Sequence, residues 1–190
     1  EEGACEYGVP VETIASVFTV LQQATAKGVV VIEAAGNSAL DLDDPAFVWE
    51  NESGDSGAII VGAGFPGSLL PTSSSNFGSR VDVQGFGEGV VTTAATYGEL
   101  GYPKGDVNNA YTESSPKTSP NWFSDTSSAA AVVAGVVASL QGVAKSNGVI
   151  LSPEQVRSIL VQTGIKQGES EKNIGLLPNL SQAILMIPDP

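Results

Sequence analysis

The chain has 190 residues, of which 42% are hydrophobic and 15% charged, a composition typical of a folded domain. Its 8 Lys and Arg against 21 Asp and Glu give a formal charge of −13, which argues against DNA, RNA and anionic membranes as partners. There is no histidine, and Cys5 is the single cysteine. The commonest general base and metal ligand are therefore missing, and we expect no cofactor and no metal site. No apolar run is long enough for a membrane span.

Helical and strand patterns alternate along the first half of the chain. Apolar residues follow helical spacing after Pro10, and Gly28 can end that helix. The β-branched run 29–32 is typical of a buried strand, and a helix followed by a strand indicates a parallel α/β unit. Further strands are expected at 58–61, 81–83 and 89–93. The acidic stretch 38–57 indicates a solvated surface, with a calcium loop as the alternative, although it lacks EF-hand spacing.

The second half is dominated by the run Ala129–Leu140, which is almost entirely Ala, Val and Gly. Because it has no polar face, it predicts a central helix enclosed by protein. Ser127 stands at the start of this helix, where it is either a cap or a nucleophile at the positive end of the helix dipole. The remaining expectations are a functional loop over 94–123, a strongly capped helix from Ser152 to Gly164 and a short helix near Leu180–Met186.

Three segments occur in a recognisable order: Gly-Val-Val-Val-Ile-Glu-Ala-Ala-Gly-Asn at 28–37, Ser-Asn-Phe-Gly-Ser-Arg-Val-Asp-Val at 75–83, and Phe-Ser-Asp-Thr-Ser-Ser-Ala at 123–129. Together they resemble the oxyanion, recurrent middle and nucleophile segments of subtilisin-like serine proteases, the subtilases. The resemblance covers about residues 10–165. It implies a three-layer α/β fold with a mostly parallel sheet and helices on both faces.

The resemblance also implies a division of labour within the site. Ser127 would attack the scissile carbonyl of a peptide or protein substrate, while its own N–H and the side-chain amide of Asn37 would donate to the oxyanion. Ala34, Ala35 and Gly36 would line one side of the pocket for the residue before the cleaved bond. Without the serine segment, Asn37 would be interpreted as a turn residue after a strand.

The family's catalytic Asp and His precede the strand that leads to Asn37. Residues 1–190 are therefore expected to be the C-terminal portion of a subtilase catalytic domain, incomplete at the N-terminal side of its sheet and inactive alone. A serine hydroxyl needs an adjacent base, so the expected partner is the N-terminal part of the same domain. Family habit suggests secretion to the extracellular space.

The sequence departs from the family pattern at two positions, and the first of them leaves a second interpretation open. Asp125 stands where the family usually has glycine, and Ala131 where it usually has proline. A β-carbon and a carboxylate near an oxyanion are unfavourable, so a catalytically degenerate relative acting as a binding or scaffold module is the alternative.

Two other families also have some support in the sequence. Sedolisins, the related serine-carboxyl peptidases, dispense with histidine, but their oxyanion residue is an aspartate, so Asn37 favours the subtilisin side. Residues 62–67 spell a dinucleotide-binding Gly-x-Gly-x-x-Gly, but Pro66 argues against the helix that such a site needs. The segment is better interpreted as a turn after the 58–61 strand.

Overall fold

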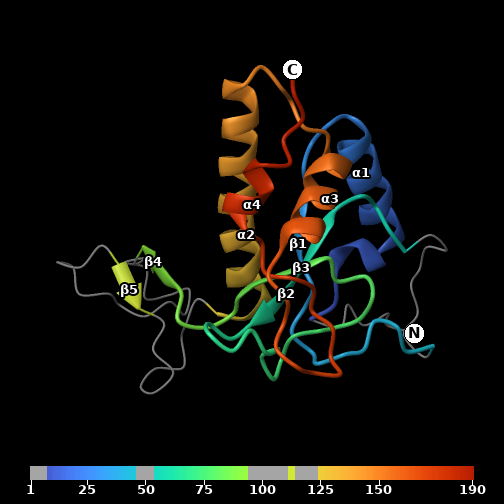
Figure 1. Ribbon diagram of the computed structural model, residues 1–190. Coiled ribbons are helices and arrows are strands. Elements are labelled where there is room, and N and C mark those ends of the chain that lie inside the picture. The colour runs from blue at the N-terminus through green and yellow to red at the C-terminus, as the bar shows by residue number, and fades with distance from the viewer. Residues whose placement is uncertain (1–7, 46–53, 94–110, 114–123) are drawn as a thin grey trace.

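A computed structural model of the chain describes residues 8–45, 54–93, 111–113 and 124–190 (Figure 1). The helices and strands, in chain order, are η1 (Val11–Thr13), α1 (Ala15–Ala26), β1 (Ile32–Ala34), β2 (Ile59–Gly64), β3 (Val83–Phe86), β4 (Val91–Thr93), β5 (Tyr111–Glu113), α2 (Asp125–Ser146), α3 (Pro153–Thr163) and α4 (Leu180–Ile184).

The centre of the fold is a parallel sheet in the order β1-β2-β3. Ile32 is opposite Ile59 in the first pair of strands, and Val61 is opposite Val83 in the second. β4 and β5 form a separate antiparallel pair to one side of this sheet (Figure 1). The expected α/β class with a mostly parallel sheet is confirmed.

The long helix α2 crosses one face of the sheet, with α3 and α4 beside it (Figure 1). Alternate side chains of β2 and β3 point to this face and pack on the buried stripe of α2, forming the larger hydrophobic core. Its fully buried members include Val61, Val83, Val133, Leu140 and Leu160.

Loop residues cover much of the opposite face. Ile60 of β2 packs there with Leu42, Val81 and Ile174 in a smaller buried cluster. The short helix η1 adjoins this side, because the Glu12 N–H donates to the Glu33 carboxylate at 2.8 Å. The sheet is thus a middle layer between helices and a loop-rich layer.

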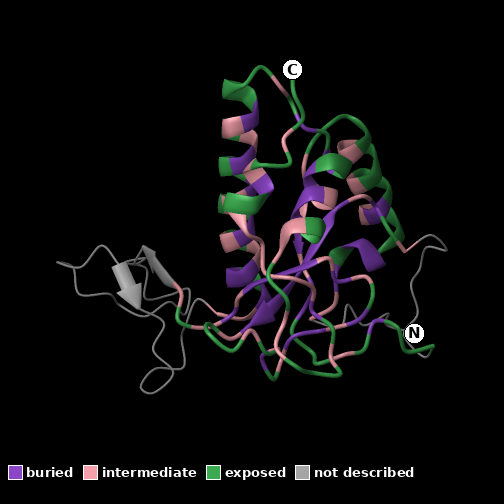
Figure 2. Cartoon of the chain, in the orientation of Figure 1, coloured by how far each residue is buried: buried purple, intermediate pink, exposed green. Residues whose placement is uncertain are grey.

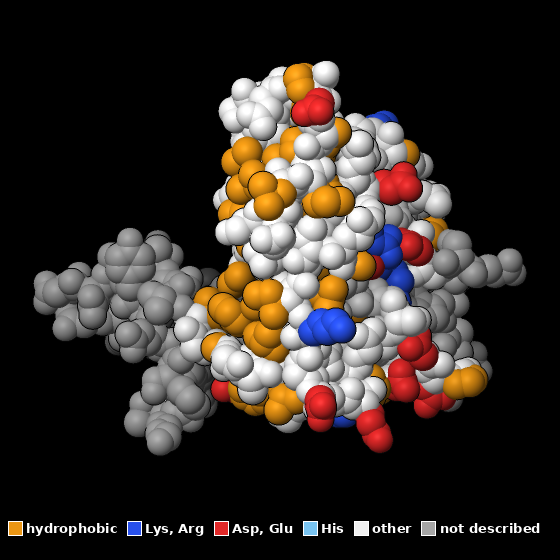
Figure 3. Space-filling model, in the orientation of Figure 1, with side chains coloured by type: hydrophobic (Ala, Val, Ile, Leu, Met, Phe, Trp, Pro, Cys, Tyr) orange, Lys and Arg blue, Asp and Glu red, His pale blue; other side chains and the backbone are white. Residues whose placement is uncertain are grey.

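The expectation that the apolar helix is enclosed on all sides is wrong. One stripe of α2 is buried, but the opposite stripe is exposed (Figure 2). Figure 3 shows hydrophobic side chains gathered along this helix at the surface. Within the run Ala129–Leu140, the exposed residues are Ala131, Ala134, Gly135, Ala138 and Ser139. By length and composition α2 could cross a membrane, a test that core helices of soluble proteins also pass.

Several predicted elements differ in their bounds from those in the structure. β2 continues to Gly64, so Gly62 and Gly64 are strand residues and not a turn; an added Cβ at Gly62 would press on Ile174. No helix follows at residues 65–70, which removes the dinucleotide-site geometry. α3 has the expected Ser152 capping box. The predicted functional loop, residues 94–123, falls largely outside the described residues. Of this stretch, the structure describes only β5.

Candidate active site

The loop that follows β1 has a backbone path that only glycine adopts easily. Gly36 has φ +96°, and a Cβ there would overlap the carbonyl oxygen of Gly8. This turn carries the chain from the buried Ala35 to the exposed Asn37. Glycine is therefore required for steric reasons where the sequence shows Ala-Gly-Asn.

Asn76 holds this loop from beneath and is fully buried. Its Nδ2 donates to the carbonyls of Gly8 at 2.6 Å and Ala35 at 2.8 Å. Its Oδ1 accepts from the N–H groups of Ser38 at 3.0 Å and Leu40 at 2.9 Å. One side chain thus fixes the backbone on both sides of Asn37.

Ser127 lies in the first turn of α2 and is not its cap. The N-cap is Ser124, so interpreting Ser127 as the cap is wrong. The Ser127 side chain is exposed, and within the described residues neither its hydroxyl nor its backbone N–H has a hydrogen-bond partner. A free hydroxyl and a free N–H therefore lie at the positive end of the 22-residue helix.

Thr126 connects the helix to the Asn37 loop. Asn37 Oδ1 accepts from the Thr126 N–H at 3.1 Å and from the Thr126 hydroxyl at 2.6 Å, and that hydroxyl accepts from the Gly36 N–H at 3.2 Å. Because a backbone N–H can only donate, this contact fixes the amide orientation of Asn37 and leaves its Nδ2 as the outward donor. In the described part of the chain that Nδ2 has no partner.

Asn37 and Ser127 line the same cavity of about 310 Å³, together with Ala34 and Gly36. Ala35 does not line it, because its side chain is fully buried in the smaller core cluster. The structure therefore brings four of the five predicted site residues together and directs the fifth into the interior.

Asp125 adopts the left-handed backbone conformation, with φ +60°. Aspartate tolerates this region better than most residues. Its carboxylate accepts from the Ser74 hydroxyl at 2.5 Å, and its N–H donates to the Gly87 carbonyl at 2.8 Å. The aspartate therefore takes a conformation that suits glycine, and its charge is held by a neighbouring hydroxyl.

A charged cluster lies deeper, around Arg80. This guanidinium contacts Glu12 at 2.7 Å and Asp82 at 2.9 Å, and Arg157 contacts Asp82 at 2.6 Å and Asp55 at 2.8 Å. Burial raises the pKa of Asp82, against the opposing effect of the two guanidinium groups. The cluster ties η1 and α3 to the segment that leads into β3.

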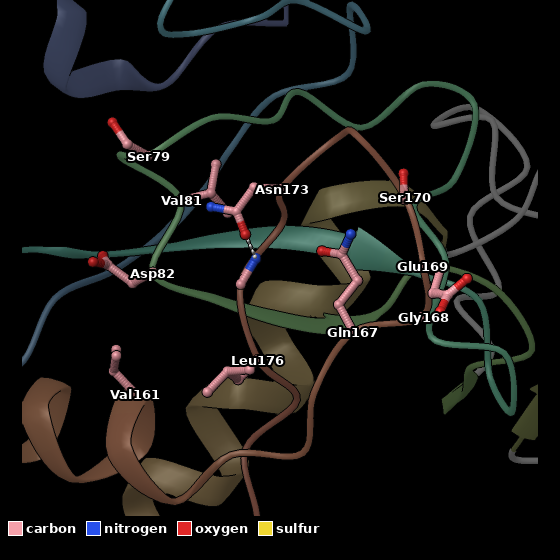
Figure 4. Close-up of a pocket in the computed structure, with 11 residues that line it drawn as sticks. Ser79, Val81, Asp82, Val161, Gln167, Gly168, Glu169, Ser170, Asn173 and Leu176 are labelled. Atoms are coloured by element: carbon pink, nitrogen blue, oxygen red, sulfur yellow. Dashed lines mark hydrogen bonds between the residues drawn. The ribbon is translucent and has the colours of Figure 1, made fainter.

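A second cavity, of about 490 Å³, is lined by Asp82, Gln167 and Asn173 (Figure 4). The polar groups of these side chains bond to the protein itself: Gln167 bonds the chain at 172 and 174, and the Asn173 carbonyl accepts from the Gly175 N–H. Neither Ser127 nor Asn37 lines this cavity, so it is separate from the candidate active site. In the acidic stretch 38–57, the Asp43 carboxylate accepts hydrogen bonds from the N–H and the hydroxyl of Ser79.

Sequence reasoning assigned no role to three residues that shape the site. Asn76 and Thr126 stand inside the quoted motifs, so their place in those segments was the available signal. Glu33 is a lone carboxylate in an otherwise apolar strand, which is a pattern that sequence alone can flag.

The profile of the subtilase family, peptidase S8, matches residues 7–177, and the chain belongs to that family. Its fold is similar to that of the patellamide maturation protease PatA, with a TM-score of 0.66 and 20% identity over 95% of this chain and 60% of that one. It is also similar to fervidolysin from Fervidobacterium pennivorans, described as a keratinolytic enzyme related to subtilisin, with a TM-score of 0.65 and 24% identity over 92% of this chain and 25% of that one.

A third similar structure is the PatG macrocyclase in complex with peptide, with a TM-score of 0.63 and 20% identity over 92% of this chain and 48% of that one. The chain thus spans at most 60% of the length of these structures. A comparison with curated proteins found no match.

Proposed function

We propose that this chain supplies the nucleophile and oxyanion donors of a serine-type endopeptidase, with an acyl-enzyme forming on Ser127. The observation that carries the proposal is the bonding of Asn37. Its carbonyl end is held by Thr126, which leaves its amide group as the donor, and Asn37 lines the same cavity as Ser127.

In this mechanism the Ser127 oxygen forms a bond to the substrate carbonyl carbon, and its proton passes to a base. The carbonyl oxygen gains negative charge, which the Ser127 N–H and Asn37 Nδ2 stabilise. Collapse expels the amine with a proton from the base and leaves an ester, which water then hydrolyses. The chain has no histidine, so the base is a residue of the N-terminal part of the same domain.

The substrate is a peptide or protein. Ala34 and Gly36 line the cavity beside Asn37 and form one wall for the residue before the cleaved bond. Ala35 supports this wall from within, because its carbonyl is fixed by Asn76. A secreted, extracellular location accompanies this proposal on family habit.

Labelling with a fluorophosphonate tests the function. We expect weak labelling of residues 1–190 alone and strong labelling of a longer protein that contains the upstream segment. Ser127→Ala should abolish labelling, and Asn37→Leu should slow it by about 10²-fold or more. Ser139→Ala is the matched control, because Ser139 is an exposed serine of the same helix. Labelling that persists in Ser127→Ala would refute the proposal.

A second candidate function is a degenerate subtilase relative that binds peptides without cleaving them. Asp125 favours it, since a carboxylate stands two residues before the proposed nucleophile. If the longer protein fails to label but Asp125→Gly restores labelling, this second function is correct.

A further inference from the structure

Asp125 holds a carboxylate next to the proposed nucleophile. It is the first residue of α2 and precedes Ser127 by two positions in the first turn of the helix. Its backbone has φ +60°, a conformation that glycine adopts without steric cost, so a side chain is present where the backbone favours none. Outliers of this kind are concentrated at functional sites, which makes the carboxylate itself a candidate for a function.

No cation balances this carboxylate in the part of the chain that the structure describes. Its Oδ1 accepts from the Ser74 hydroxyl at 2.5 Å, and its Oδ2 has only the Ser124 hydroxyl, at 3.4 Å. Every ion pair between described residues involves Arg80 or Arg157, and Asp125 takes part in none of them. Because Asp125 is half-buried, its attraction for a cation is screened less than that of a fully exposed carboxylate.

The contacts of Asp125 place it beside the chain that leaves Asn37. The Ser74 hydroxyl donates to Asp125, and the Ser74 carbonyl accepts from the Ala39 N–H at 2.8 Å. The cavity, by contrast, is lined by the chain that leads into Asn37 and by neither Ser74 nor Asp125. A peptide with its acyl side in the cavity therefore continues past Ser127 toward Asp125 with the residues of its leaving amine.

We propose that Asp125 selects substrates with a lysine or an arginine at the first or second residue after the cleaved bond. This inference rests on the proposed function, because it names the substrate class that the same site takes. Either side chain carries its cation on a long, flexible stem, so the charge can reach the carboxylate while the peptide backbone passes Ser127.

The same contact removes an obstacle to catalysis. A carboxylate near Ser127 opposes the negative charge that develops on the oxyanion, and a cation bound to that carboxylate cancels part of the repulsion. Asp125 thus favours catalysis on cationic substrates and opposes it on neutral or acidic ones. The preference should therefore appear in kcat/KM, and it should weaken as salt is added.

Three internally quenched peptides test this on the longer protein that contains the upstream segment. They share one acyl half, and their first two leaving-side residues are both lysine, both norleucine or both glutamate. Mass spectrometry of the products identifies the cleaved bond. We expect kcat/KM for the lysine peptide to exceed that for the norleucine peptide by about fivefold or more, the effect of one favourable ion pair, and the glutamate peptide to be the poorest. These differences should vanish in Asp125→Asn.

Two further variants distinguish Asp125 from a neighbouring charge and from a folding defect. Glu88→Gln removes the carboxyl group that follows Gly87, whose carbonyl accepts from the Asp125 N–H, and this variant should keep the lysine preference. Asp125→Gly removes the carboxylate and suits φ +60°, so it should abolish the preference even if Asp125→Asn does not fold. Circular dichroism shows whether each variant is folded.

Binding of the same peptides to Ser127→Ala distinguishes this inference from the proposed function. The variant lacks the nucleophile, so fluorescence anisotropy measures recognition without cleavage. A lysine preference in binding, together with no fluorophosphonate labelling of the wild type, would support recognition by Asp125 and refute the hydrolytic function. A lysine preference in neither cleavage nor binding, or one that survives in a folded Asp125 variant, would overturn the inference, while labelling would still report the nucleophile.

Discussion

Replacing Glu33 by glutamine should flatten the pH dependence of stability. The pKa of this carboxyl is raised from its ordinary value of 4.5 to about 7 because burial disfavours its charged form. The folded chain therefore binds a proton more tightly than the unfolded chain. The stability that this tighter proton binding contributes is fully present below pH 4.5 and is lost as the pH rises through about 7.

The size of the effect follows from the two pKa values. One pKa unit corresponds to about 1.4 kcal/mol, so the full contribution is roughly 3 kcal/mol, of which about 2.5 kcal/mol is lost between pH of about 5 and about 8.5. The glutamine side chain would still accept the Glu12 N–H through its carbonyl oxygen, which makes the exchange nearly isosteric. The variant should exceed the wild type only slightly near pH 5 and by roughly 3 kcal/mol near pH 8.5.

Urea unfolding at both pH values measures this difference, with Glu171→Gln as the exposed control. Other groups, such as Asp82, titrate in both proteins, so subtracting the two profiles isolates Glu33. Parallel profiles for the wild type and Glu33→Gln would refute this reasoning, because they would show that the Glu33 carboxyl is hydrated in solution.

Substitutions at three further positions test the loop and the helix start by the free energy of unfolding. Gly36→Ala should cost roughly 2 kcal/mol or more, because alanine is strained at φ +96°; a neutral result would show that the turn relaxes. Asn76→Ala should cost about 3 kcal/mol or more, since it leaves four backbone groups unbonded, and Asn76→Asp should rescue only the accepting half. Asp125→Gly should change stability by less than about 1 kcal/mol, because relief of φ +60° offsets the lost Ser74 bond.

Local signals in the sequence predicted the regular elements well. Ser152 with Pro153 located α3, and the β-branched run before Ala34 located β1 to within a few residues. The end of β2 was missed because glycines normally indicate a turn. In this fold Gly62 and Gly64 stay in the strand, since neighbouring side chains occupy the space of a Cβ.

The surroundings of each element were harder to predict than its type. The run Ala129–Leu140 has no polar face, yet only one side of it packs on the sheet. Alanine and glycine carry little information about burial because they tolerate both environments. The four bonds of Asn76 join positions far apart in sequence, so no local pattern could have assigned them.

The predicted oxyanion donors do not titrate near neutral pH. The pH dependence of the rate and the pH dependence of stability should therefore have different origins. The Ser127 N–H and the Asn37 amide carry no proton that titrates near neutrality, and Thr126 holds that amide through neutral groups. Under the proposed function, a pH–rate profile would therefore report the general base and not these two donors. Glu33 lines the same cavity as these donors, but in the described structure it has no hydrogen bond to Ser127 or Asn37 and acts on stability. Glu33→Gln should consequently shift the pH at which the assembled protein unfolds while leaving the pKa values of its rate profile in place.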